Sequence, residues 1–153
     1  MVNPPKRHIS KQLGELLLER KVITKKQLDN AVKVQLEKGG LLGAILVSIG
    51  ATSEEAIAQA LTTQYGFPYL PLVNYEIDRE LIKGVPVTVA KQYCLIPIDK
   101  IGNSLTIAIS DPLNIHAIED IELITGCSVQ VFVSTQTDIK KAIDKHYASV
   151  PEG

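Results

Sequence analysis

The chain has 153 residues, of which 45% are hydrophobic and 22% are charged, and its formal net charge is −1. This length and composition are typical of one soluble globular domain, or of two small subdomains that share a core, and they exclude a disordered chain. No apolar run approaches the ~20 residues that cross a bilayer, and residues 1–10 are polar where a signal peptide is apolar. We therefore expect a cytoplasmic protein with no direct membrane insertion.

The charged and metal-ligating residues exclude several functions. Cys94 and Cys127 are too few for a disulfide framework or a CxxC zinc site, and the three histidines are scattered, so the sequence predicts no metal centre. The near-neutral net charge gives no field that would hold nucleic acid. Residues 1–40 nevertheless carry nine Lys or Arg against four acidic residues. This basic stretch fits either a solvated helix face or an anionic ligand or partner near the N-terminus.

A repeat with a 29-residue shift is the most informative feature of the first half. The shift lays residues 13–18 (LGELLL) on residues 42–47 (LGAILV), and it carries Gln35 onto Gln64. In each copy, apolar residues fall on one helical face before and after a break, so each copy predicts a helical hairpin. For the second helix of the first copy, the inward residues are predicted to include Ala31 and Leu36.

Capping residues place the ends of these helices. Residues 24–27 have the pattern of a capping box, and residues 52–55 offer the same chemistry in the second copy. Gly39-Gly40 separates the copies, and Gly50 ends the third helix. The first half is therefore predicted to consist of four helices.

Two residue types interrupt the apolar pattern of both copies. Gln35 and Gln64 lie in line with the apolar stripe, so each amide is predicted to bond a loop backbone or a bound ligand. Gly14 and Gly43 lie inside helices, where glycine costs about 1 kcal/mol relative to alanine. Either another helix or a planar ligand is expected to approach the bare backbone there.

The helical period ends after Gln64. Residues 65–71 contain two prolines and a glycine and predict an extended linker into a second subdomain. Pro86 is placed to open a short helix. Residues 94–99 and 105–109 then predict two strands joined by a turn at 101–103.

The remaining elements complete a small α/β unit. Asp111-Pro112 has the pattern of a helix N-cap followed by proline, with a helix that ends at Gly126. Alternating valines over residues 129–133 predict a strand, and residues 135–138 predict the cap of a closing helix. The predicted fold is α+β. It has a four-helix subdomain of two repeated helical hairpins (9–65), a small α/β subdomain with a three- to four-stranded sheet (66–148) and the start of a linker (149–153).

Several motifs together resemble a known family. The chain resembles, over about residues 9–148, the N-terminal (MshEN) domain of the type II secretion and type IV pilus assembly ATPases, the GspE and PilB family. The resemblance rests on six features of the sequence: the two Leu-Gly to Gln repeats, their joint at residues 36–40, residues 65–68, Val85-Pro86, residues 95–97 and Asp111-Pro112.

The resemblance implies a regulatory and docking domain. In this family the domain precedes a hexameric motor and links it by protein contact to the cytoplasmic domain of the inner-membrane secretion or pilus platform. The chain has no GxxxxGK[ST] loop and no acidic Walker B strand, so it is predicted to be non-catalytic. It is expected to be either a fragment of such an ATPase or a standalone relative, cytoplasmic and peripheral to the inner membrane through its partners.

The resemblance also implies an alternative function, the binding of cyclic di-GMP as a sensor. The matching candidate positions are Gln12, Leu13, Gly14, Leu17, Gln35, Leu41, Leu42, Gly43, Leu46, Gln64 and Asp111. Gln12 and Leu41 replace the arginine of each repeat, so the charge and the planar guanidinium are lost. Lys11, or Lys6 and Arg7, can supply charge to the first repeat without the guanidinium fork. Loss of two such contacts, at roughly 1.5–3 kcal/mol each, predicts weak binding.

Single residues suggest no catalytic constellation. Asp111 has the position of a phospho-receiver aspartate, but a role as helix N-cap already accounts for it. Cys94 and Cys127 lie in or beside predicted strands and are expected to pack as small apolar residues. His116 is expected on the surface of a helix.

Overall fold

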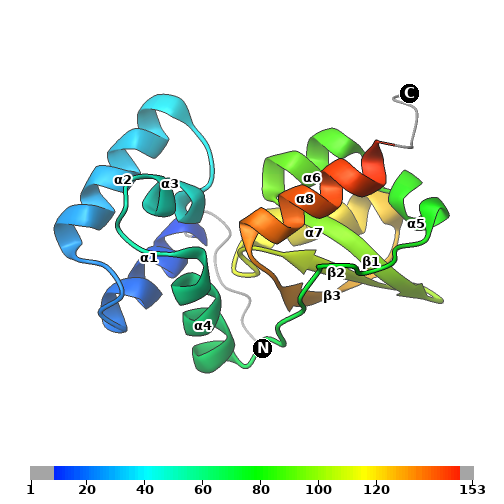
Figure 1. Cartoon of the computed structure of the whole chain (residues 1–153), viewed down its shortest axis with the longest axis horizontal. Helices are drawn as coiled ribbons and strands as arrows, with labels where there is room; N and C mark the ends of the chain where they lie inside the picture. The colour runs from blue at the N-terminus through cyan, green and yellow to red at the C-terminus, as the bar shows by residue number, and fades with distance from the viewer. Residues whose placement is uncertain (1–8, 149–153) are drawn as a thin grey trace.

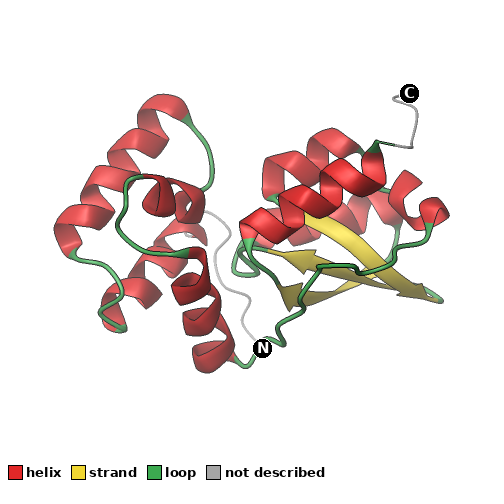
Figure 2. Ribbon diagram, viewed as in Figure 1, coloured by secondary structure: helices red, strands yellow, loops and turns green. Residues whose placement is uncertain are grey.

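The computed structural model describes residues 9–148, with side chains described from residue 12 onward. Within this range, eight helices and three strands form a helical part followed by an α/β part (Figures 1 and 2). The predicted α+β class is confirmed, with four helices in the helical part and a small sheet in the α/β part. The predicted linker at 149–153 lies outside the described residues. The limits of the two subdomains remain a prediction, because buried Leu113 and Val133 belong to the core of the helical part.

The helical part contains the two predicted hairpins. The first consists of α1 (Ile9–Glu19) and α2 (Lys25–Lys38), and the second of α3 (Leu42–Ser48) and α4 (Glu54–Tyr65). The capping box at Thr24 is confirmed, because Thr24 and Gln27 each accept a hydrogen bond from the other's backbone N–H. In the second hairpin the N-cap is Ser53, whose Oγ accepts from Ala56 N at 3.1 Å, so the prediction of a cap at Thr52 is wrong by one residue.

Helix geometry explains which apolar residues of α2 are buried. Ala31 is fully buried, whereas Leu36 is 83% exposed, so the prediction that Leu36 faces inward is wrong. At 3.6 residues per turn, five positions rotate Leu36 by about 140° from Ala31, onto the far side of the helix. Gln35, only four positions from Ala31, stays half-buried.

The α/β part contains a three-stranded mixed sheet. Helices α5 (Arg79–Lys83) and α6 (Val87–Tyr93) precede β1 (Leu95–Ile101), β2 (Ser104–Ile109), α7 (Ile115–Thr125), β3 (Ser128–Val133) and α8 (Gln136–Tyr147). The strand order is β1-β2-β3, with β1 antiparallel and β3 parallel to β2. A crossover helix, α7, joins the parallel pair, as parallel strands require.

Alternation along the strands gives the sheet two buried faces. Leu105, Ile107 and Ile109 of β2 pack in one cluster with Ala117 and Ile121 of α7. The other face supplies Ile96, Ile98 and Ala108, which cluster with residues of α6 and α8. Both faces of the strands are therefore covered, which explains the nearly continuous apolar runs of β1 and β2.

Two loop expectations have different outcomes. The predicted extended linker after α4 is confirmed, since Leu70 N donates to Val133 O and Val133 N donates to Pro68 O. The predicted helix start at Asp111 is wrong. Helix α7 is capped by Asn114, whose Oδ1 accepts from Ala117 N at 3.2 Å. Asp111 instead accepts from Leu113 N at 3.0 Å within the preceding turn.

Candidate functional site

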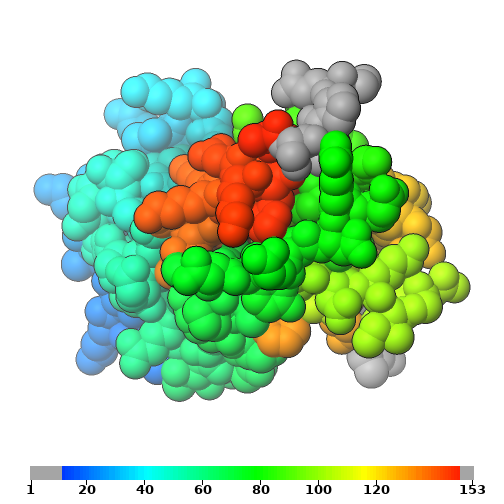
Figure 3. Space-filling model, turned by 45° about the vertical axis from the view of Figure 1, so that its right-hand side comes forward, coloured from blue at the N-terminus to red at the C-terminus, as the bar shows by residue number. Residues whose placement is uncertain are grey.

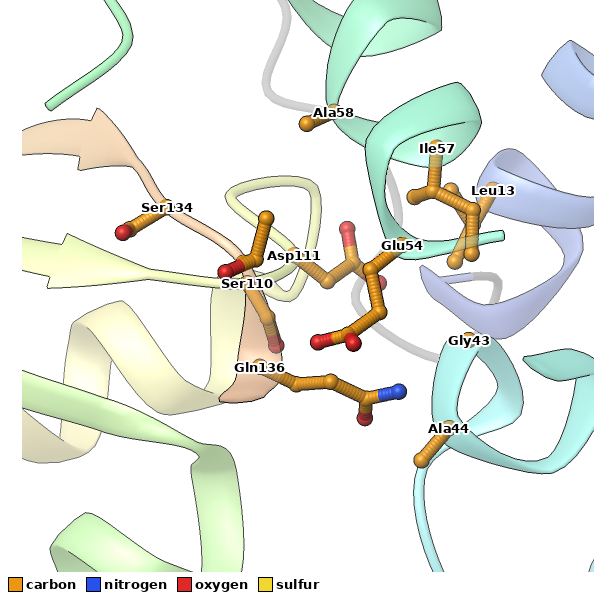
Figure 4. A pocket seen from close by; sticks show the side chains of 11 residues that line it. Leu13, Gly43, Ala44, Glu54, Ile57, Ala58, Ser110, Asp111, Ser134 and Gln136 are labelled. Atoms are coloured by element: carbon orange, nitrogen blue, oxygen red, sulfur yellow. The ribbon is translucent and has the colours of Figure 1, made fainter. Parts of the chain in front are cut away.

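A small pocket lies where the helical part meets one edge of the sheet (Figure 4). Ser110 and Asp111 directly follow β2, and residues 134–136 directly follow β3. The carboxyl ends of these parallel strands meet at one edge, which brings the two segments together. The helical part closes the pocket with residues of α1, α3 and α4, namely Leu13, Gly43, Ala44, Glu54, Ile57 and Ala58. The pocket is small, with a volume of about 30 Å³.

Glu54 joins the two halves at this pocket. Thr137 N donates to Glu54 Oε1 at 2.5 Å, and Thr137 Oγ1 donates to Glu54 Oε2 at 2.6 Å. Glu54 is in the first turn of α4 and Thr137 is in the first turn of α8. The carboxylate therefore satisfies a backbone donor that α8 leaves unpaired and lies near the positive ends of two helix dipoles. We refer to this contact as the Glu54–Thr137 bridge.

Asp111 and Ser134 place further polar groups in the pocket wall. Burial raises the pKa of the Asp111 carboxyl to about 7, and the hydrogen bond from Leu113 N opposes that change only in part. The hydroxyl of Ser134 is buried and has no hydrogen-bond partner. Among the lining residues that the structure describes there are two carboxylates and no Lys, Arg or His. This lining therefore contains no positive charge that would attract an anionic ligand.

The structure brings some of the candidate ligand positions together. Leu13, Gly43 and Asp111 line the pocket. The remaining candidates do not line it: Gln12, Gly14, Leu17, Gln35, Leu41, Leu42, Leu46 and Gln64. The side chains of Lys6, Arg7 and Lys11 lie outside the described residues. A ligand role for any of these positions stays a prediction.

The local surroundings of four of these candidates explain their positions. Leu17 and Leu46 are fully buried in the helical core. Gln35 donates from Nε2 to Gly40 O at 3.0 Å, so the predicted bond to a loop backbone is confirmed. Gln64 is exposed at the end of α4, so the prediction that it lies in line with the buried apolar stripe is wrong.

The two repeat glycines have different surroundings. A Cβ on Gly14 would lie 2.9 Å from Leu28 Cδ1, so the half-buried Leu28 side chain of α2 would have to move. A Cβ on Gly43 would find its nearest neighbours at 3.6 Å and 3.7 Å, an ordinary contact distance. Packing against α2 therefore favours glycine at position 14, whereas Gly43, which lines the pocket, has room for a methyl group.

Sequence reasoning missed Glu54, Ser110, Ser134, Gln136 and Thr137. A signal was present, because a serine directly follows each of the strands β2 and β3. Its meaning depended on knowing that these strands are parallel, which the sequence alone did not provide.

The described residues offer few other sites. No group of three or more His, Cys, Asp or Glu within residues 9–148 has a metal-binding arrangement. In the same range, none of the helices combines the length and the apolar character that a membrane span needs. Cys94 and Cys127 are buried, as expected for packing residues.

The Glu54–Thr137 bridge gives a first prediction. Replacing Glu54 by alanine should lower the free energy of unfolding by about 1–2 kcal/mol, because two charge-assisted hydrogen bonds are lost at a partly solvated site. Amide hydrogen exchange should become faster at Thr137 N–H. Glu55→Ala is the matched control, since Glu55 is an exposed glutamate in the same helical turn. Unchanged exchange at Thr137 in Glu54→Ala would contradict the bridge.

The arrangement of repeated helical hairpins against the strand ends of a small mixed sheet defines a class of two-part α+β domains. Residues 65–153 match the profile of the MshEN domain. This match covers more than half of the chain. The chain therefore belongs to the MshEN family.

The curated relatives include proteins of type IV pilus assembly and of type II secretion. The chain is 35% identical over 140 residues to the type IV pilus assembly ATPase PilB of Myxococcus xanthus, covering 92% of this chain and 25% of that protein. It is 27% identical over 140 residues to the type II secretion system protein E of Xanthomonas campestris, covering 89% and 25%. The chain thus spans about a quarter of the length of these relatives.

Solved structures share the fold. The N-terminal domain of XpsE matches with a TM-score of 0.71 and 24% identity over 95% of this chain and 98% of that one, which shows the fold alone. A structure of MshE with cdg matches with a TM-score of 0.64 and 26% identity, covering 88% and 98%.

Proposed function

We propose that this chain is the regulatory and docking domain of a type II secretion or type IV pilus assembly ATPase. In this proposal it binds the cytoplasmic domain of an inner-membrane platform protein and holds the motor there, in the cytoplasm. The observation that carries the proposal is the similarity to PilB along 92% of the chain. The fold of the XpsE N-terminal domain supports it.

The pocket between the halves does not favour an anionic nucleotide as the main ligand. It is small, its lining contains two acidic residues and no cation among the described residues, and Glu54 bridges its two sides. The chain is then a non-catalytic part of the assembly, and the rest of the ATPase supplies ATP hydrolysis.

Direct binding tests this proposal. The chain is immobilised and titrated with the purified cytoplasmic domain of the platform protein encoded with it, in biolayer interferometry. We expect saturable binding with a dissociation constant in the micromolar range. No binding at high micromolar concentration would overturn the docking function.

A second candidate function is the binding of cyclic di-GMP. It is favoured by the similarity to the structure of MshE with cdg, and by the meeting of Leu13, Gly43 and Asp111 in one pocket. The absence of a cation from the described pocket lining argues against tight binding. Calorimetric titration with cyclic di-GMP separates the two functions, since a low-micromolar site would establish the second one.

The repeat glycines give a matched prediction for this pocket. Gly43→Ala should raise the free energy of unfolding by about 0.5 kcal/mol, because the methyl fits and alanine favours the helix. Gly14→Ala should be less stable than Gly43→Ala, because its methyl meets Leu28. Urea denaturation measures both. If cyclic di-GMP binds in the pocket, Gly43→Ala should lower the affinity for cyclic di-GMP more than Gly14→Ala does. The reverse stability order would contradict this packing.

A further inference from the structure

A second and larger concavity lies at the far end of the α/β part. It has a volume of about 770 Å³ and shares no lining residue with the pocket between the halves. Its walls come from the segment before α5, from α5 itself, from the second half of β1 and from the end of α7. In Figure 3 the yellow-green β1–β2 hairpin projects on this side of the molecule, below the green residues around α5. We call this concavity the acidic groove.

The acidic groove combines an apolar floor with a charged rim. Its apolar lining residues are Leu81, Val85, Ile98, Leu105 and Ile124, of which Leu81 and Ile124 keep accessible surface and the other three are buried. Its acidic lining residues are Glu76, Asp78, Glu80 and Asp99, against the single cation Lys100. The volume falls in the range of ~300–1,000 Å³ that is usual for binding sites. The groove therefore offers apolar contact together with an excess of negative charge.

Two elements that line the groove also carry exposed apolar side chains. Ile101, the last residue of β1, is 76% exposed, and Leu123 and Ile124 in the last turn of α7 are 83% and 45% exposed. Single exposed aliphatic residues are ordinary, but here three lie on the two elements that also line the groove.

Local contacts leave the acidic rim able to accept further hydrogen bonds. Asp78 Oδ1 accepts from Glu80 N, and Asp99 Oδ1 accepts from Lys100 N, each at 2.9 Å. Glu80 pairs with Lys83 at 3.3 Å on the exposed surface, where such a pair contributes little. A carboxylate has about four lone-pair positions, so these bonds do not saturate the rim.

We propose that the acidic groove docks a basic peptide segment of the partner protein, with an aliphatic side chain on the floor and Lys or Arg side chains at the rim. This inference rests on the proposed docking function and adds the surface and the chemistry of the partner. Charge selects the occupant, because the rim repels nucleic acid and anionic lipid and attracts cationic side chains. The apolar floor adds burial that a purely ionic contact lacks.

Peptide titration tests the groove directly. The probes are two nine-residue synthetic peptides, one alternating Lys and Leu and one alternating Glu and Leu, added to the ¹⁵N-labelled chain. We expect the Lys-Leu peptide to shift amide signals of α5, the end of β1 and the end of α7, and to bind at least tenfold more weakly in 0.5 M salt. The Glu-Leu peptide should leave these signals unchanged. Equal binding of both peptides, or shifts elsewhere on the molecule, would overturn the proposal.

Charge reversal separates this proposal from the docking function. The double variant Glu76→Lys/Asp99→Lys replaces two exposed side chains. It should weaken the binding of the Lys-Leu peptide and the binding of the platform domain by at least tenfold. Glu37→Lys, on exposed α2, is the matched control and should bind like the unmodified chain. If the platform domain binds the double variant normally, the groove proposal is wrong and docking stands. The other outcome is that the platform domain fails to bind the unmodified chain while the Lys-Leu peptide binds the groove. In that case the proposed docking to the platform protein is wrong, and the preference of the groove for basic segments stands.

Discussion

Replacing Leu46 by alanine should lower the free energy of unfolding by about 2–5 kcal/mol. Leu46 is fully buried in the core of the helical part, where Leu13, Leu17 and Leu61 are also inaccessible to solvent. Truncation removes buried methyl groups and leaves a cavity that rigid neighbouring helices fill only in part. Urea denaturation followed by circular dichroism at 222 nm measures the loss.

Leu36→Ala is the matched control for this experiment. Leu36 is a leucine of the same helical part, but it is 83% exposed, so its truncation should change the free energy of unfolding by less than about 0.5 kcal/mol. A loss below 1 kcal/mol for Leu46→Ala would mean that the helical core is not packed as described.

The Leu46 result also decides how a ligand role of this position must be tested. The family resemblance places Leu17 and Leu46 among ligand contacts, yet both are fully buried. A fully buried side chain touches a ligand only after its surroundings move. Any loss of cyclic di-GMP binding in Leu46→Ala therefore has to be compared with the folded fraction before it counts as a lost contact.

Elements with a strong local pattern were predictable from the sequence. The four helices follow from the repeat and from capping chemistry at Thr24, which needs only residues within one turn. The β1–β2 hairpin follows from two apolar runs around Gly102, whose φ of 58° favours glycine. In these segments, local preference and tertiary packing agree.

Prediction failed where two local patterns compete. Asp111-Pro112 and Asn114 both have helix-capping chemistry, and the structure uses Asn114 because Asp111 closes the preceding turn on Leu113. Thr52 and Ser53 present the same ambiguity one residue apart. Such choices depend on the exact path of the backbone, which sequence pattern does not fix.

The pocket could be predicted only in part, because it depends on tertiary structure. Asp111 was a candidate from sequence, but its neighbours come from the ends of two parallel strands and from the start of α4. The Glu54–Thr137 bridge joins residues 83 positions apart. No local sequence pattern predicts such a contact, since it exists only once both halves are folded and packed.

Asp111 gives the second large effect, a dependence of stability on pH. Its pKa is raised from 3.8 to about 7 in the folded chain, with desolvation as the main cause. Between these values the folded state holds a proton that the unfolded state has lost, so the free energy of unfolding should fall as pH rises from about 4 to 7 and then level off. A tenfold difference in proton affinity between the two states corresponds to about 1.4 kcal/mol. Because the residue keeps some exposed surface, we expect a loss of about 1–2 kcal/mol across this window.

Asp111→Asn isolates this effect of the charge, because the amide oxygen can still accept from Leu113 N and carries no charge. Urea denaturation of both chains at pH 4, 5.5, 7 and 8 gives the difference in free energy of unfolding. At pH 4 both side chains are neutral in the folded state, so that value measures any steric cost of the amide. The difference should then move in favour of Asp111→Asn up to pH 7 and stay constant at pH 8. A difference that does not vary with pH would show that the carboxyl is solvated, and the pocket would then be more open than its volume of about 30 Å³ implies.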